Sequence, residues 1–307
     1  MAGSLKLREA VFKCLSINPG VKMKARDIAE WIIEKYPEEV ATKVSNSKFI
    51  IDLGQLRNQL VAEIGSNRPK WEEKYLSLRS TADKPRRYYW SKETDEQVVE
   101  AAELLDQHST LSQPGFIPES LLYAKLGEFV VAEFDVQTMR IDEKTASNKK
   151  GPNANKWLYP DVCGLQSKIS GYGSEVLDLL KLAGGKKAAL WSFEVKVVLN
   201  TSNVRESYFQ TVSNSSWANF GYLVASQIDE KVMPELRVLH NLHGIGIIQL
   251  NHEDPVESQT LIPALQKQEV DWGAMNRLAL ENADFRAYAK RAKHFYQTDD
   301  ANPALWK

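Results

Sequence analysis

Residues 190–199, LWSFEVKVVL, constrain the fold more than any other stretch of the chain. The run is apolar and β-branched and contains no Gly or Pro, so it predicts a buried strand. Glu194 and Lys196 interrupt the run, and residues two apart in a strand point to the same face. Burying a carboxylate and an ammonium is costly unless they pair or meet a ligand. The strand therefore predicts a sheet core that carries a charged site.

A second strand-like stretch, residues 157–164, contains a single acid, Asp161. An acid on one strand with Glu-x-Lys on the next is a metal-and-base arrangement that cuts phosphodiesters. Each fragment alone has an ordinary explanation, since Pro-Asp is a common turn dipeptide and Glu-x-Lys is often a solvated pair. Their joint occurrence on apolar strands, in this order, favours a catalytic site.

Magnesium is the cofactor that this arrangement predicts, with Mn²⁺ as the expected substitute. Mg²⁺ prefers oxygen ligands, and Asp161, Glu194 and the backbone carbonyl of Val195 would supply them. The ion would lower the pKa of a bound water and steady charge on the scissile phosphate. Lys196 would orient or help deprotonate the attacking water, or neutralise the pentacoordinate phosphorane.

Two more residues are catalytic candidates. Glu119 lies in the first turn of a predicted helix, 117–134, on the same stripe as Leu122, and would be a further acid of the site. An ordinary acidic residue at a helix N-terminus explains it equally well. Gln210, in a predicted helix over 204–218, could point back at the same site or lie on the surface.

The rest of the second half predicts an α/β fold with a mixed β-sheet flanked by helices. The passage from strand 190–199 through helix 204–218 to strand 221–225 predicts a right-handed parallel crossover. Further elements predicted from apolar spacing are strand 138–142, helix 174–182, helix 234–242, strand 245–250 and a long amphipathic helix, 273–296.

The first 92 residues predict a winged helix-turn-helix. Three helices are expected over 7–15, 25–36 and 53–65, followed by two short strands, 74–78 and 87–90. The third helix would enter the major groove of DNA, where amide side chains read base edges. Wing residues would meet phosphates. The predicted DNA-binding residues are Gln55, Arg57, Asn58, Gln59, Arg79, Lys84, Arg86 and Arg87. A winged helix that contacts protein, or a plain solvated face, is the alternative.

Charge divides the chain in two. Residues 1–92 hold 18 Lys and Arg against 11 Asp and Glu, whereas the remainder has an excess of eight acidic residues. A basic first domain points to a polyanion. We expect a DNA-binding domain over 1–92, an acidic helical linker over 93–114 and a catalytic domain over 115–307. No apolar run spans a bilayer and two distant cysteines suggest a reducing compartment, so a cytoplasmic protein without membrane contact is expected.

The motifs resemble those of known families. Pro160-Asp161 with Glu194-Val195-Lys196 resembles the PD-(D/E)xK, or restriction-endonuclease-like, nuclease superfamily, with an inserted helix between the two motifs. Residues DLGQLRNQL and KPRRYYW resemble the HARE-HTH winged-helix family, and the whole arrangement is similar to HrgA-type bacterial proteins associated with restriction loci. The resemblance implies a catalytic core of Asp161, Glu194 and Lys196, with Glu119 as a fourth member and third acid.

The leading functional hypothesis is therefore a Mg²⁺-dependent DNA endonuclease of restriction or phage-defence type, whose winged helix selects double-stranded DNA, including modified bases. A non-cleaving DNA-binding regulator and a structure-specific repair nuclease are the alternatives. Double-strand cutting by one active site usually requires two copies, so a homodimer is expected. Phosphate-loop and dinucleotide-binding motifs are absent from the sequence.

Overall fold

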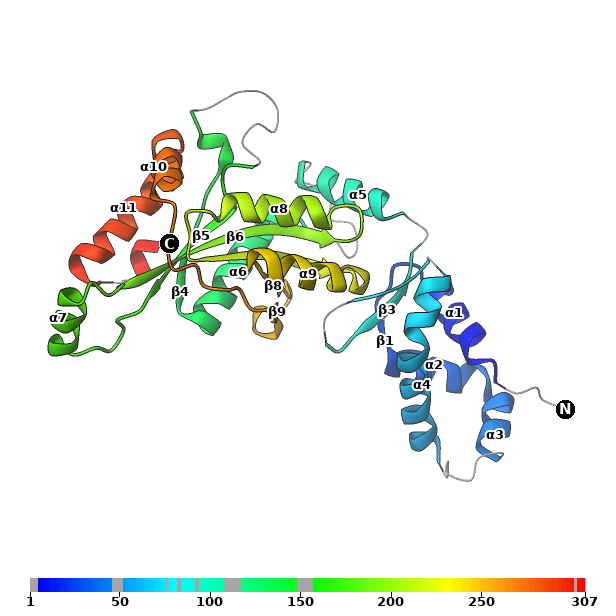
Figure 1. The fold of residues 1–307 in the computed structure, drawn as a ribbon. Coiled ribbons are helices and arrows are strands. Elements are labelled where there is room, and N and C mark those ends of the chain that lie inside the picture. The colour runs from blue at the N-terminus through cyan, green and yellow to red at the C-terminus, as the bar shows by residue number, and fades with distance from the viewer. Residues whose placement is uncertain are drawn as a thin grey trace. The chain divides into compact units, whose positions relative to one another are not determined.

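The computed structural model describes residues 5–45, 52–75, 77–81, 84–91, 94–107, 117–147, 157–300 and 303–306. The chain forms two compact units, Met1–Val98 and Val99–Lys307. The mixed α/β class expected from the sequence is confirmed (Figure 1).

The first unit combines helices with a small antiparallel sheet of strand order β1-β3-β2. Its elements are α1 (Leu7–Ile17), β1 (Met23–Lys24), α2 (Ala25–Lys35), α3 (Pro37–Ser45), α4 (Leu53–Lys74), β2 (Leu78–Ser80) and β3 (Arg87–Trp90). Apolar residues at helical spacing, among them Val11, Ile28 and Leu60, are fully buried and form its core. A further helix, α5 (Asp95–Gln107), starts in this unit and runs into the second.

The sequence expectations for this unit need two corrections. The helix predicted to end near Gly65 continues to Lys74 through Pro69, so the strand predicted from Lys74 is replaced by β2 at Leu78–Ser80. Trp71 explains the extension, since its ring packs edge-on against Phe12 of α1 and tertiary contact outweighs the helix-breaking residue. Helix α3 was not predicted.

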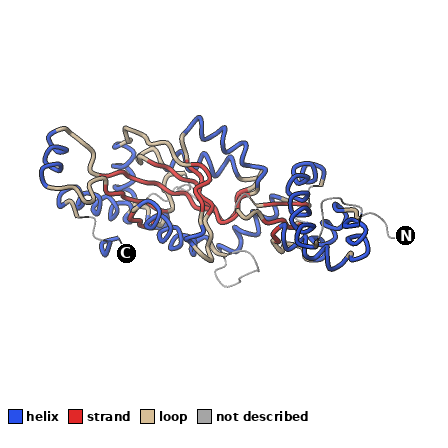
Figure 2. Tube along the Cα trace, turned by 90° about the horizontal axis from the view of Figure 1, so that it is seen from below, coloured by secondary structure: helices blue, strands red, loops and turns tan. Residues whose placement is uncertain are grey.

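The second unit is built on a six-stranded mixed sheet of order β4-β5-β6-β7-β8-β9. Its strands are β4 (Val136–Arg140), β5 (Val162–Ser167), β6 (Ala188–Leu199), β7 (Phe220–Ile228), β8 (Gly246–Gln249) and β9 (Gln259–Ile262). Its helices after α5 are α6 (Glu119–Phe134), α7 (Ser174–Leu182), α8 (Val204–Asn214), α9 (Met233–His243), α10 (Trp272–Glu281) and α11 (Ala283–Thr298), with short 3₁₀ turns at Glu143–Thr145, Glu230–Val232, Pro255–Glu257 and Pro303–Trp306. Figure 2 shows the strands as an inner layer with helices outside them.

Strand β6 is the centre of this sheet. It pairs antiparallel with β5 and parallel with β7, which confirms the predicted parallel crossover through α8. One face of the strand carries Trp191 and Phe193, which meet Phe134 of α6 and Tyr222 of β7 in an aromatic cluster. The opposite face carries Ser192 and Glu194, and α8 lies along it (Figure 1).

Apart from small shifts in where elements begin and end, the second unit differs from the expectations at three places. The strand predicted over 157–164 begins only at Val162, directly after Pro160 and Asp161, because proline cannot donate to a sheet ladder. The tail predicted as one helix is two, because Asn282 adopts an extended conformation and caps α11 through its side-chain oxygen. Strand β9 was not predicted.

In the part of the chain that the structure describes, every helix is too short or too polar to cross a lipid bilayer.

Candidate active site

Asp161 lies at the entrance to β5, beside the middle of β6. Its Oδ2 accepts a hydrogen bond of 2.7 Å from the backbone N–H of Val195. The pairing of β5 with β6 starts one residue later, at Val162 and Phe193. Beyond that pair, the N–H of Val195 is bonded to the Asp161 carboxylate instead of to a backbone carbonyl of β5. The two motifs that the sequence predicted to lie on neighbouring strands therefore meet at this point.

Glu194 and Lys196 project side by side from β6, as their spacing predicted. Lys196 Nζ donates to Glu194 Oε1 at 2.6 Å. The Glu194 side chain is only 1% exposed, whereas that of Lys196 is 18% exposed. The pair thus places a buried carboxylate beside a largely buried ammonium.

The electrostatic environment shifts both groups. Burial and the nearby charge of Asp161 raise the pKa of Glu194 from 4.5 to about 8, against the lowering effect of Lys196. Burial alone would lower the pKa of Lys196, but the carboxylates of Glu194, Glu119 and Asp161 outweigh burial and raise that pKa above its ordinary value. Lys196 is therefore a persistent cation in a site that is short of positive charge.

Asn214, at the end of α8, is a residue of this site that the sequence did not reveal. Its Nδ2 lies 2.9 Å from Glu194 Oε2 and donates also to the carbonyl of Tyr159. The side chain is buried, so these bonds form away from water. Gln210, the residue predicted from this helix, is buried one turn earlier on the same face. The signal that could have found Asn214 is this i, i+4 spacing from Gln210.

Glu119 joins the site through a second group of residues. Tyr123, one turn later on α6, donates its hydroxyl to Glu119 Oε1 at 2.7 Å. Burial, Asp161 and Glu119 raise the pKa of Tyr123, so the phenol stays neutral and remains a donor. Arg140, the last residue of β4, stacks its guanidinium 3.9 Å from the centre of the Tyr123 ring. Neither Tyr123 nor Arg140 was predicted as a site residue.

The predicted metal ligands lie on one side of β6. Since the N–H and C=O of one strand residue point to the same side, the carbonyl of Val195 faces the Asp161 side of the strand. Across the described ranges, no three His, Cys, Asp or Glu side chains come together as a metal-binding group. Two carboxylates and a backbone carbonyl fit a magnesium ion, which keeps several waters. The site holds three acids, Glu119, Asp161 and Glu194. Its side-chain cations are two, Lys196 and Arg140. A bound metal ion would favour the ionised form of Glu194.

The residues predicted to bind DNA divide into two groups. Gln55, Asn58 and Gln59 are exposed on α4, and Lys84 is exposed before β3. Arg86, just before β3, and Arg87, its first residue, are half-buried. The other two form ion pairs within the first unit, Arg57 at its surface and Arg79 in its interior. Arg57 forms an ion pair of 3.2 Å with Glu30 of α2, and the buried Arg79 lies 2.5 Å from Asp95 of α5. The placement of Arg79 argues against its predicted contact with phosphate.

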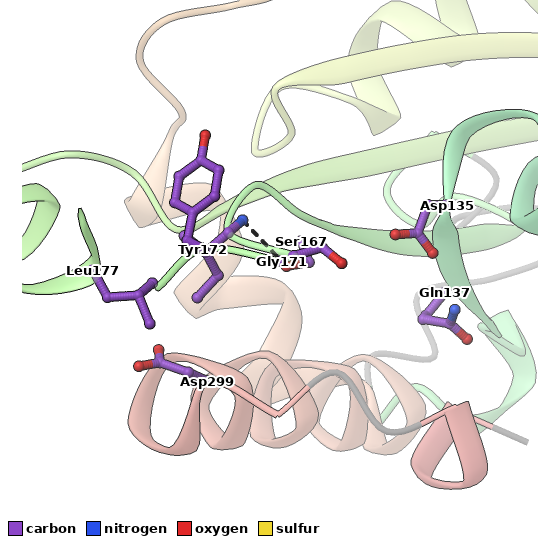
Figure 3. Close-up of a pocket in the computed structure, with 9 residues that line it drawn as sticks. Asp135, Gln137, Ser167, Gly171, Tyr172, Leu177 and Asp299 are labelled. Atoms are coloured by element: carbon purple, nitrogen blue, oxygen red, sulfur yellow. Dashed lines mark hydrogen bonds between the residues drawn. The ribbon is translucent and has the colours of Figure 1, made fainter. Parts of the chain in front are cut away.

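A separate surface pocket of about 420 Å³ lies elsewhere in the second unit (Figure 3). Asp135, Gln137, Ser167, Tyr172 and Asp299 are among its lining residues. It is at the far end of β4 and β5, because Val136 pairs with Gln166 there whereas Arg140 pairs with Val162 beside the candidate site. Asp299 is already paired with Lys187 at 2.5 Å, so the pocket offers no free catalytic acid from that residue.

No protein-family model, curated protein or solved structure matches this chain significantly.

Proposed function

We propose that this protein is a Mg²⁺-dependent DNA endonuclease that hydrolyses phosphodiester bonds at the site formed by Asp161, Glu194 and Lys196. One observation carries the proposal: Asp161 is hydrogen-bonded to the strand residue between Glu194 and Lys196, which are themselves paired at 2.6 Å. This is the set of groups that the resemblance to PD-(D/E)xK nucleases implies, assembled from two neighbouring strands.

Asp161, Glu194 and the Val195 carbonyl are the groups that would hold the cation. Mg²⁺, when bound, supplies activation of a water molecule and neutralisation of charge on the scissile phosphate. Lys196 acts beside it as a cation, because its raised pKa keeps the ammonium protonated at neutral pH. Of the roles open to this lysine, neutralising charge on the phosphorane is therefore favoured over removing a proton from water.

The first unit is proposed to be a winged helix that delivers DNA to the nuclease. Its excess of basic residues, the exposed amides of α4 and the basic residues before and within β3 support this role. Restriction or phage defence, with selection of modified bases, is the biological setting that the family resemblance suggests. Two copies of the chain would cut both strands, and a monomer found by light scattering during cleavage would contradict that part of the proposal.

A plasmid assay tests the activity. Unmodified and cytosine-modified supercoiled DNA is incubated with the protein in Mg²⁺ or in EDTA. We expect cleavage only with the metal, reduced at least a hundredfold by Glu194→Gln. The exposed Glu253 provides the matched control, and Glu253→Gln should cut at the wild-type rate. Cleavage by Glu194→Gln at the rate of the control would refute the assignment.

A non-cleaving DNA-binding regulator is the second candidate. The basic first unit favours it. Tight binding in a gel shift without Mg²⁺, together with no cleavage of any DNA, would support the regulator. Preferential cutting of forked, gapped or four-way DNA would instead indicate a repair nuclease.

A further inference from the structure

Arg140 reaches the candidate site from β4, a strand that carries none of the predicted catalytic groups. Its Nη1 donates to the backbone carbonyl of Asp161 at 2.5 Å and lies 3.3 Å from Oδ1 of the same residue. The carbonyl of Asp161 also accepts the N–H of Ile141, so β4 holds the backbone and the carboxylate of Asp161 together.

The other carboxylate oxygen of Asp161 points the opposite way. Oδ2 accepts the N–H of Val195, so the carboxylate spans from Arg140 on one side to β6 on the other. With both oxygens engaged, rotation about the Cβ–Cγ bond of Asp161 would break one contact or the other. Arg140 thus restricts the orientation of the Asp161 carboxylate.

Tyr123 holds Arg140 in that position. The guanidinium carbon of Arg140 lies over the ring, 3.9 Å from its centre, and the Tyr123 hydroxyl donates to Glu119. Stacking and a planar fork are properties of arginine that lysine lacks. A lysine at position 140 would keep the charge but lose the stacking and the planar guanidinium whose Nη1 meets both the carbonyl and Oδ1 of Asp161.

We propose that Arg140 is a positioning residue that orients Asp161 for the cation, with the Tyr123 ring as its support. This proposal rests on the proposed function. It predicts that Arg140 and Tyr123, which are not metal ligands themselves, contribute to the metal affinity of the site. Groups that orient ligands in this way change metal affinity by about 10-fold to 100-fold when they are lost.

The amide of Val195 reports on this arrangement without any metal. Its N–H is held by the Asp161 carboxylate, whereas Phe193, two residues earlier, pairs with Val162 in the sheet. In the full-length protein, hydrogen exchange measured by NMR should accelerate at least tenfold at Val195 in Arg140→Lys, with little change at Phe193. Unchanged exchange at Val195 would overturn the proposal.

A pair of variants at Tyr123 keeps the test decisive if Arg140→Lys unfolds. Tyr123→Phe retains the ring and should protect Val195 as the wild type does, whereas Tyr123→Leu should accelerate its exchange. Arg237→Lys, on an exposed part of α9, is the matched control. Equal exchange at Val195 in the two Tyr123 variants would count against the supporting role of the ring.

Titration calorimetry with Mn²⁺ alone separates this inference from the proposed function. Arg140→Lys and Tyr123→Leu should bind Mn²⁺ about tenfold more weakly than the wild type and Tyr123→Phe. If the wild type bound no Mn²⁺, the proposed function would fail. The hydrogen-exchange rate of the Val195 amide would still show whether Arg140 orients Asp161. Equal Mn²⁺ affinity in all four proteins would overturn the role of Arg140 toward the cation.

Discussion

Glu194 couples the protonation of the site to the stability of the fold. Its pKa of about 8 in the folded protein lies above the ordinary 4.5, so the folded chain holds the proton more tightly than the unfolded chain. Stability is then complete below pH 4.5 and is lost as the pH rises toward 8, since the unfolded state releases its proton first.

The metal-free protein should therefore lose stability between about pH 5 and pH 8 through this residue. Urea unfolding across that range measures the effect. Glu194→Gln cannot titrate, so the free energy of unfolding of this variant relative to wild type should increase with pH. A constant difference between the two proteins would show that Glu194 does not carry the effect.

Asn214 should matter for stability as well as for the site. Asn214→Ala removes a buried donor from Glu194 and from the carbonyl of Tyr159, which should lower the free energy of unfolding by about 2 kcal/mol. Asn241→Ala, on the exposed side of α9, should change it by less than about 0.5 kcal/mol. Similar urea midpoints for the two variants would contradict this role.

Individual residues differ in how far the sequence could predict them. Glu194 and Lys196 were predictable as neighbours because strand periodicity fixes their common face. The contact of Asp161 with β6 followed from the order of the motifs. Asn214, Arg140 and Tyr123 carry no motif, and they join the site only through the packing of α8, β4 and α6 against β6.

At the scale of elements, the buried pair of Arg79 and Asp95 joins the strand β2 to the start of α5. The boundary expected after residue 92 would separate these two side chains, whereas the compact unit extends to Val98. Breaking a buried ion pair leaves an uncompensated charge, which is strongly destabilising. The first turn of α5 therefore belongs physically to the first unit.

In a fragment of residues 1–107, Asp95→Ala should lower the free energy of unfolding by about 3 kcal/mol. Glu96→Ala, which removes an exposed acid from the same turn, should have an effect below about 0.5 kcal/mol. Chemical denaturation of the two variants measures the difference. Equal stability would mean that Asp95 does not anchor α5.

Elements with strong periodicity were predictable, and those decided by tertiary contact were not. Strand 87–90 and helix 174–182 have the predicted bounds. The extension of α4 past Pro69 depends on Trp71 packing against α1, and the division of the C-terminal helix depends on the fully buried Asn282, which also donates to the carbonyl of Asp142. Neither contact can be predicted from the helix or strand propensities of the local sequence.

At the scale of the whole molecule, the opposite charges of the two halves predict that DNA affinity depends on salt. Each phosphate contact contributes about 0.9 to the slope of log affinity against log salt. Replacing Lys84, Arg86 and Arg87 together by alanine should reduce that slope by about 2 to 3 in fluorescence anisotropy. The same change at Lys290, Arg291 and Lys293 of α11 should leave the slope unaltered, and an equal reduction would place the DNA contact elsewhere.

The most direct test of the central claim is single-turnover cleavage of DNA by Lys196→Ala in Mg²⁺, with DNA binding measured in parallel. If Asp161, Glu194 and Lys196 form the catalytic site, the variant should bind DNA like the wild type and cut it at least a hundredfold more slowly. Lys168→Ala, an exposed lysine just after β5, should cut normally. Undiminished cleavage by Lys196→Ala would contradict the account.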